Sequence, residues 1–135
     1  MSARRKARKR ALDFLYEADI RKASALELHA IRPAEELSEG DYVGVLLVGV
    51  NDHLAKIDEL IVTYAQGWDL DRMPSIDRNL LRIALFEILW LDNLDDKIAV
   101  SEAVEIAKEL STEESAGYIN GVLGRIIALK PALTI

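Results

Sequence analysis

Six basic side chains within the first ten residues form a dense cluster of positive charge. They are Arg4, Arg5, Lys6, Arg8, Lys9 and Arg10, and no acidic residue lies among them. The whole chain is nevertheless acidic, with 17 basic residues, 23 acidic residues and a formal net charge of −6. A concentrated cationic end on an acidic chain is typical of proteins that bind a polyanion, because phosphate groups attract clustered Lys and Arg side chains. The pattern predicts phosphate binding, with nucleic acid as the first candidate.

The same cluster has two other interpretations. It can be a solvated terminus that only aids solubility, or a polybasic helix on an anionic membrane surface. Residues 1–10 contain no large apolar side chain except Met1, so membrane insertion would be shallow and nucleic acid is favoured. Six cations on two helical turns point around most of the helix circumference, so about three or four of them are expected to contact phosphate. These charges are also expected to add little to the stability of the fold.

Two tyrosines indicate which kind of nucleic acid is bound. Tyr16 follows the basic cluster and Tyr118 lies near the C-terminus. Aromatic rings stack on the unpaired bases of single strands, which favours single-stranded RNA. The alternative is that both rings are edges of the core with their hydroxyls in water. A helix-turn-helix DNA-binding protein would carry its cations on an inner helix, but the inner segments here are acidic or balanced.

Catalytic and metal-binding chemistry has little support in the sequence. The chain has no cysteine, and its two histidines, His29 and His53, each stand alone. A nucleophile needs a neighbouring base, and a metal needs clustered ligands. No apolar run reaches the ~18–20 residues of a membrane span. We therefore expect a cytoplasmic protein that is not an enzyme, needs no cofactor or metal, and does not enter a membrane.

The spacing of apolar residues predicts an all-α fold of about six or seven helices, because these residues recur at steps of three and four. Capping boxes are expected at Ser24–Glu27 and Ser111–Glu114, and a further cap within residues 38–41. Two glycines in the third helix, Gly44 and Gly49, would allow another helix to pack closely. The expected helices cover residues 3–22, a short segment before Pro33, 42–66, 75–91, 101–110 and a last helix that ends before Pro131.

Three segments in order resemble the bacterial NusB family of transcription antitermination factors. They are ARKRALDFLYE at 7–17, IDRNLLRIALFE at 76–87, and SEAVEIAK at 101–108 followed by YINGVL at 118–123. The resemblance implies one domain over residues 1–135, with two packed three-helix subdomains of about 1–70 and 71–135. It implies a factor that binds boxA-type RNA of ribosomal RNA leader transcripts together with NusE, a small-subunit ribosomal protein. The pair would join the RNA polymerase antitermination complex, and a homodimer is possible.

The resemblance also assigns RNA-binding residues, and it places the last helix alongside the first. It narrows the six cations of the first helix to about four contacts and leaves Lys9 and Arg10 solvated. Arg78 and Arg82, in the middle segment, would extend the RNA track or support the contact with NusE. The alternative function is a helical protein–protein adaptor that does not bind RNA directly. The RNA-binding residues that the resemblance implies are Arg4, Arg5, Lys6, Arg8, Tyr16, Arg78, Arg82, Glu114 and Tyr118.

Overall fold

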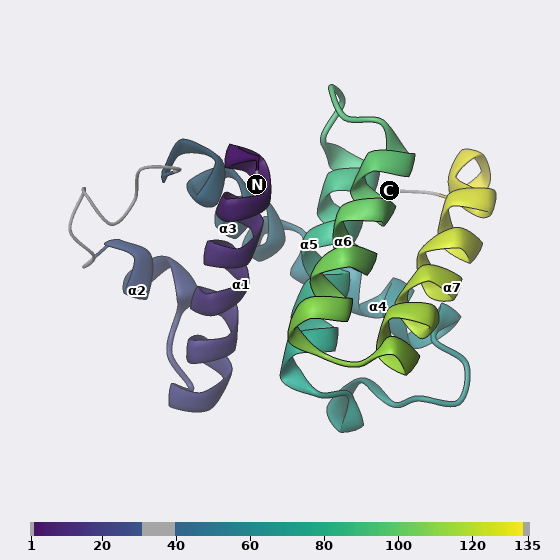
Figure 1. Ribbon diagram of the computed structural model, residues 1–135, viewed down its shortest axis with the longest axis horizontal. Coiled ribbons are helices and arrows are strands. Elements are labelled where there is room, and N and C mark those ends of the chain that lie inside the picture. Colours follow the sequence, from purple (N-terminus) through teal and green to yellow (C-terminus); the bar gives the residue numbers. More distant parts are fainter. Residues whose placement is uncertain (1, 31–39, 134–135) are drawn as a thin grey trace.

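The computed structural model describes residues 2–30 and 40–133, which form seven α-helices and two short 3-10 helices (Figure 1). The 3-10 helices are η2 (Leu70–Arg72) and η3 (Lys130–Ala132). No strand occurs within the described residues, so the prediction of an all-α fold is confirmed. The α-helices are α1 (Ala3–Arg21), α2 (Ala25–Ala30), α3 (Gly40–Asp52), α4 (Leu54–Tyr64), α5 (Ser75–Trp90), α6 (Asp96–Leu110) and α7 (Glu113–Leu129).

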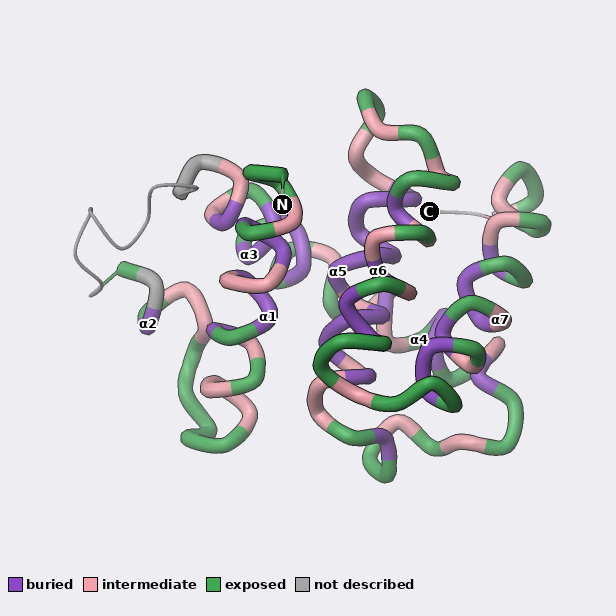
Figure 2. Tube along the Cα trace, in the orientation of Figure 1, coloured by how far each residue is buried: buried purple, intermediate pink, exposed green. Residues whose placement is uncertain are grey.

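Helix α5 is the centre of the molecule and contacts α1, α3, α4, α6 and α7. Most of its length is buried (Figure 2), including the polar residues Asp77, Asn79 and Glu87, because helices pack against it on several sides. Helices α1, α2 and α3 pack on one another on one side of α5, and α6 and α7 pack together on the other (Figure 1). The subdomain boundary near residue 70 stays a prediction. Helix α4, which precedes it, packs on α5 and α7, which follow it.

The single long helix predicted over residues 42–66 is wrong, because the chain turns at His53 and forms two helices, α3 and α4. The backbone of His53 has φ −114° and ψ 14°. Its ring stacks on Trp90, with 4.1 Å between the ring centroids and 13° between the planes. No Gly or Pro marks the turn, so the apolar pattern runs through it without interruption. The turn lets α4 pack on α5 and α7.

Helix α3 approaches α5 closely at Gly49, as the glycine pattern predicts. A Cβ atom at this position would lie 2.2 Å from Cε1 of Phe86. A real side chain cannot occupy that space, so glycine is what allows the two helices to meet here.

The helix starts show which local signals are reliable. The Ser24 cap is confirmed, since the Glu27 amide donates to Ser24 Oγ at 3.4 Å. Helix α6 begins at Asp96, not at residue 101 as predicted, because the Asp95 side chain accepts a hydrogen bond from the Lys97 amide at 2.8 Å and acts as the cap. Residues 38 and 39 of the cap predicted before α3 lie outside the described residues.

Candidate nucleic-acid interface

The first turns of α1 carry basic side chains in two different environments. Ser2 caps the helix by accepting a hydrogen bond from the Arg5 amide at 3.1 Å, so the cations are held on ordered turns. Arg4 and Lys6 are exposed, as expected for side chains that meet phosphate. Arg8, one turn further along, is only 3 % exposed. One short stretch of sequence therefore contains both accessible and buried cations.

Arg8 is held between two glutamates of other helices. Its guanidinium donates to Glu87 of α5 at 3.0 Å and to Glu102 of α6 at 2.9 Å. The Tyr42 hydroxyl donates to Glu87 from the other side. Burial opposes the charge of Arg8, but the hydrogen bond and charge of Glu87 outweigh it, and the pKa of Arg8 is raised. Contact with RNA would require Arg8 to leave both carboxylates.

This buried cluster corrects the expectation that the basic residues add little to stability. Removing one partner of a buried ion pair leaves an uncompensated charge, which costs about 3–5 kcal/mol. Glu87 is 1 % exposed and would lose its guanidinium partner if Arg8 were removed. Arg8 is therefore a stabilising residue of the fold.

Two further cations of α1, Arg5 and Lys9, are paired with acidic residues of α6. Arg5 forms an ion pair with Glu102, and Lys9 forms one with Glu109 at 2.5 Å. The hydrogen bond from Arg5 lowers the pKa of Glu102 and outweighs the opposing effect of burial. The expectation that Lys9 and Arg10 are solvated is wrong. Lys9 is held by Glu109, and the guanidinium of Arg10 lies 5.9 Å from the ring centroid of Phe14.

Arg4 is positioned by an aromatic ring. Its guanidinium carbon lies 4.5 Å from the centroid of the Tyr42 ring, within the range of a cation–π contact. Arg4 remains exposed, and so does Tyr16 further along α1, with 41 % of its surface accessible. The exposed groups that α1 offers to a ligand therefore include Arg4, Lys6 and Tyr16.

Arg78 and Arg82 of α5 both form ion pairs within the fold. Arg78 donates to Asp19 at 2.8 Å, and Arg82 donates to both carboxylate oxygens of Asp58, at 2.8 and 2.9 Å. Burial would raise the pKa of Asp19, but hydrogen bonds from Ser75, Arg78 and Asn79 lower it. These two arginines connect α5 to α1 and to α4, so their assignment to RNA would require an exchange of partners.

The two remaining predicted residues lie on α7. Thr112 caps this helix by accepting a hydrogen bond from the Ser115 amide at 2.9 Å. Glu114 is exposed in the first turn. Tyr118 is half-buried, its hydroxyl donates to the carbonyl of Gln66 at 3.2 Å, and its ring meets Trp68 edge to face. Burial raises the pKa of Tyr118 and outweighs the opposing charge of Arg125.

The structure does not place α7 directly beside α1, because α5 and α6 lie between them (Figure 1). The two regions are instead linked through the end of α6. Lys9 of α1 contacts Glu109, and Thr112, which caps α7, follows three residues later. The end of α6 therefore lies between the basic turns of α1 and the start of α7.

The sequence did not predict several residues that lie in or beside the candidate interface. Trp68 lies in the connector between α4 and α5, where the only signal was an aromatic residue beside a glycine. Tyr42, Glu87 and Glu102 look like ordinary helix residues in sequence, and their contact with Arg8 is created by packing. Among the described residues, no group of three or more His, Cys, Asp or Glu could hold a metal ion. None of the described helices is long and apolar enough to cross a membrane.

Comparisons with known proteins give the family. The family model of NusB matches residues 5–128. The transcription antitermination protein NusB of Salinispora arenicola is 52% identical over 132 residues, which cover 93% of this chain and 96% of that protein. The NusB structure of T. maritima has a TM-score of 0.83 at 30% identity and covers 95% of this chain and 92% of that chain.

A structure of antitermination factors NusB and NusE in complex with double-stranded RNA has the same fold. Its TM-score is 0.76 at 24% identity, with 95% of this chain and 98% of that chain covered. The three-segment resemblance, the helical architecture and these matches agree over nearly the full length. The chain belongs to the NusB family, whose curated relatives are transcription antitermination proteins.

Proposed function

We propose that this antitermination factor binds boxA-type RNA of ribosomal RNA leader transcripts together with NusE and joins the RNA polymerase antitermination complex. The observation that carries the proposal is the set of exposed cations on ordered turns of α1, with Tyr16 on the same helix. The NusB and NusE factors of the solved complex are bound to double-stranded RNA, which supports RNA and NusE as partners of this chain. The proposed location is the cytoplasm, where transcription occurs in bacteria.

The accessibility of each cation in the free protein is the basis for ranking the proposed RNA contacts. Arg4 and Lys6 are accessible in the free protein and would bind phosphate first. Arg5 is 32 % exposed and would exchange Glu102 for a phosphate, whereas Arg8 would stay with its carboxylates. Tyr16 and Tyr118 would stack on bases. Arg78 and Arg82 would act mainly by holding α5 in place.

Fluorescence anisotropy tests this function. A labelled boxA-like RNA and a scrambled RNA of the same length are titrated with the protein, each with and without NusE. We expect tighter binding of the boxA-like RNA and a further gain with NusE. Because cations are released when phosphate is bound, a complex with three or four phosphate contacts should show a log–log salt slope of roughly −2 to −3. Equal binding of both RNAs without any effect of NusE would contradict the proposal.

A second function is favoured by the ion pairs between α1 and α6. Arg5, Arg8 and Lys9 already have carboxylate partners, as expected if the basic cluster serves the fold alone. The protein would then be a helical adaptor that binds other proteins without touching RNA. That function predicts a complex with NusE or RNA polymerase that survives RNase treatment and high salt. A homodimer is the further assembly to test, by light scattering with and without RNA.

A further inference from the structure

Tyr42 of α3 contacts two arginines of α1, one exposed and one buried. The guanidinium carbon of Arg4 lies 4.5 Å from the centroid of the Tyr42 ring, and that of Arg8 lies 5.7 Å from it. Both distances fall within the ~6 Å of a cation–π contact. Arg4 is exposed, Arg8 is buried and Tyr42 is half-buried. Tyr42 therefore joins an accessible cation of the candidate interface to the buried cluster, although the family resemblance does not assign it to RNA binding.

The Tyr42 ring is anchored at its tip. Its hydroxyl donates a hydrogen bond to Glu87 of α5, and Glu87 also accepts from Arg8 at 3.0 Å. Glu87 is 1 % exposed and Arg8 is 3 % exposed, so the acceptor of the Tyr42 hydroxyl is itself held inside the fold. A tyrosine side chain has few rotatable bonds, and a hydrogen bond at its tip therefore fixes the direction in which its ring faces. The buried ion pair thus decides where the ring that contacts Arg4 lies.

A ring holds a cation without using its hydrogen-bond donors. Arg5 and Lys9, on the same turns of α1, have carboxylate partners, and a phosphate has to displace these. The attraction between a guanidinium and a ring comes from the π electrons of the ring and needs no N–H···O bond. The N–H donors of an arginine lie in the plane of its guanidinium and match the oxygens of a phosphate. Arg4 can therefore bind a phosphate and keep its partner.

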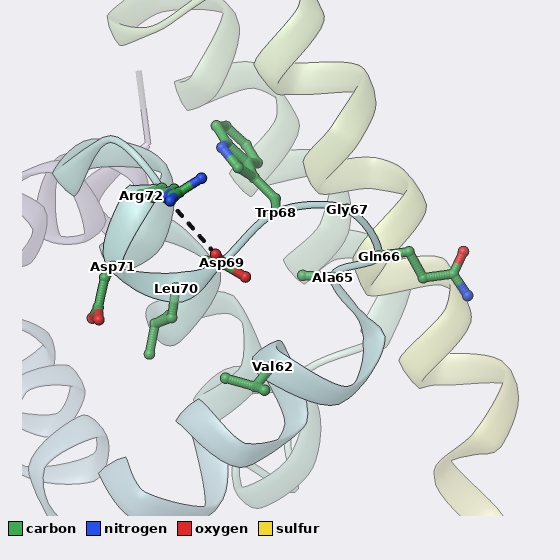
Figure 3. A pocket seen from close by; sticks show the side chains of 9 residues that line it. All are labelled: Val62, Ala65, Gln66, Gly67, Trp68, Asp69, Leu70, Asp71 and Arg72. Carbon is green, nitrogen blue, oxygen red and sulfur yellow. Dashed lines mark ion pairs between the residues drawn. The ribbon is translucent and has the colours of Figure 1, made fainter.

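Arg72 is an exposed arginine with the opposite arrangement. It lines a hollow of about 670 Å³ together with Trp68 of the connector between α4 and α5 (Figure 3). Arg72 pairs with Asp69 at 3.8 Å (Figure 3), and its side chain is 82 % exposed. An arginine and an aromatic residue can thus line one hollow while a carboxylate holds the arginine. Arg72 is therefore the matched comparison for Arg4.

We propose that Tyr42 is a positioning residue for RNA binding, whose ring holds the Arg4 guanidinium where a phosphate binds and keeps this contact in the RNA complex. The inference rests on the proposed RNA-binding function and adds a residue of α3 to it. A flexible arginine loses side-chain freedom when it binds a ligand, and holding it in place beforehand reduces that loss. Arg8 then contributes to RNA affinity without touching RNA, because it holds Glu87 and Glu87 anchors the ring.

A double-mutant cycle between Arg4 and Tyr42 tests the proposal. The affinity for boxA-like RNA is measured by fluorescence anisotropy for wild type, Y42L, R4A and the double variant, after circular dichroism has verified that each is folded. Y42L should weaken binding about 2- to 10-fold, the effect of releasing one side chain that had been held in place. The double variant should bind as R4A does, because the ring acts through Arg4. An equal loss from Y42L in the wild-type and R4A backgrounds overturns the proposal, and so does an R4A variant that binds like wild type.

Two further variants separate the ring from a general effect on the fold. Y42F keeps the ring and loses the hydroxyl, so its affinity should lie between those of wild type and Y42L although its thermal stability falls. R72A removes the same charge as R4A from an arginine that pairs with a carboxylate. The effects of R72A and Y42L should add, as they do for independent sites. Y42F that binds as weakly as Y42L, or a coupling of Y42L to R72A as large as its coupling to R4A, overturns the role of the ring.

Nuclear magnetic resonance follows the contact in the wild-type protein itself, also if Y42L does not fold. Protons above the face of an aromatic ring resonate upfield because of the ring current. The Arg4 Hδ resonances, identified by their absence from the R4A spectrum, should lie upfield in the free protein and stay there when boxA-like RNA is bound. Their return to the ordinary position on RNA binding would show that Arg4 leaves the ring, which overturns the proposal and leaves the proposed function standing. RNA that does not bind at all overturns both.

Discussion

The two ends of the candidate interface are built from different interactions. The first turns of α1 carry cations, several of which are bound to carboxylates of α5 and α6. The start of α7 instead carries the exposed carboxylate of Glu114 and the ring of Tyr118, which meets Trp68 of the connector between α4 and α5 edge to face. The comparison shows that a charge cluster in the sequence does not reveal which charges are available. Arg4 and Arg8 are one turn apart, yet only Arg4 is exposed.

The largest expected effect is the difference in the free energy of unfolding between an Arg8 variant and a Lys6 variant. Arg8→Ala should lower the free energy of unfolding by about 3–5 kcal/mol, because Glu87 stays buried without its partner. Lys6→Ala should change it by less than about 0.5 kcal/mol, because Lys6 is exposed. Urea denaturation of both variants measures this. Equal stabilities would show that Arg8 does not hold the fold.

The exposed cations should matter for RNA and not for folding. Replacing Arg4 and Lys6 together by alanine should weaken RNA binding by roughly an order of magnitude at moderate salt. The log–log salt slope should become shallower by about 1.4, because two phosphate contacts are lost. Anisotropy titrations at several salt concentrations measure both effects. An unchanged slope would place the phosphate contacts elsewhere.

Glu109 should weaken RNA binding in the wild-type protein, because it holds Lys9. Glu109→Gln releases this cation and should raise RNA affinity by about 1.5- to 5-fold, the range expected from a surface ion pair. Glu59→Gln is the matched control, since it removes the same charge from α4, where Glu59 pairs with Lys56. An equal gain in both variants would mean that only net charge matters.

The smallest expected effect is a change in the acid dependence of stability. The folded-state pKa of Glu102 is lowered from its usual 4.5, mainly by the hydrogen bond from Arg5. Its contribution to stability is therefore complete above pH 4.5 and is lost as the pH falls through the lower folded-state pKa. Denaturant unfolding from pH 7 to pH 3 should show a shallower decline for Glu102→Gln than for wild type. Parallel curves would assign the acid sensitivity to other carboxylates.

Local sequence signals predicted much of the fold. Helix α1 covers residues 3–21 against a prediction of 3–22 from its apolar spacing, and α5 occupies residues 75–90 against a prediction of 75–91. The prediction failed at His53, where the chain turns without a Gly or Pro and the His53 ring stacks on Trp90, thirty-seven residues away in sequence. It failed again at α6, which was predicted to begin at residue 101 but begins at Asp96, where Asp95 caps the helix.

The candidate site was predicted less completely than the fold. Composition and family resemblance led to the basic turns of α1 and to Glu114 and Tyr118. They did not separate Arg8 from Arg4, because a buried and an exposed arginine look alike in sequence. Trp68 was missed because the ring that it contacts, Tyr118, lies fifty residues further along the chain.

The sequence by itself determined the helical class, the family and the cationic first helix, because these depend on residue type and on spacing over a few turns. Tertiary structure alone decided which cations are accessible and which aromatic rings contact one another. Ion pairs such as Arg8–Glu87 and ring contacts such as Trp68–Tyr118 join residues far apart in the chain. Their strength depends on burial and distance, and both arise only when the helices pack around α5.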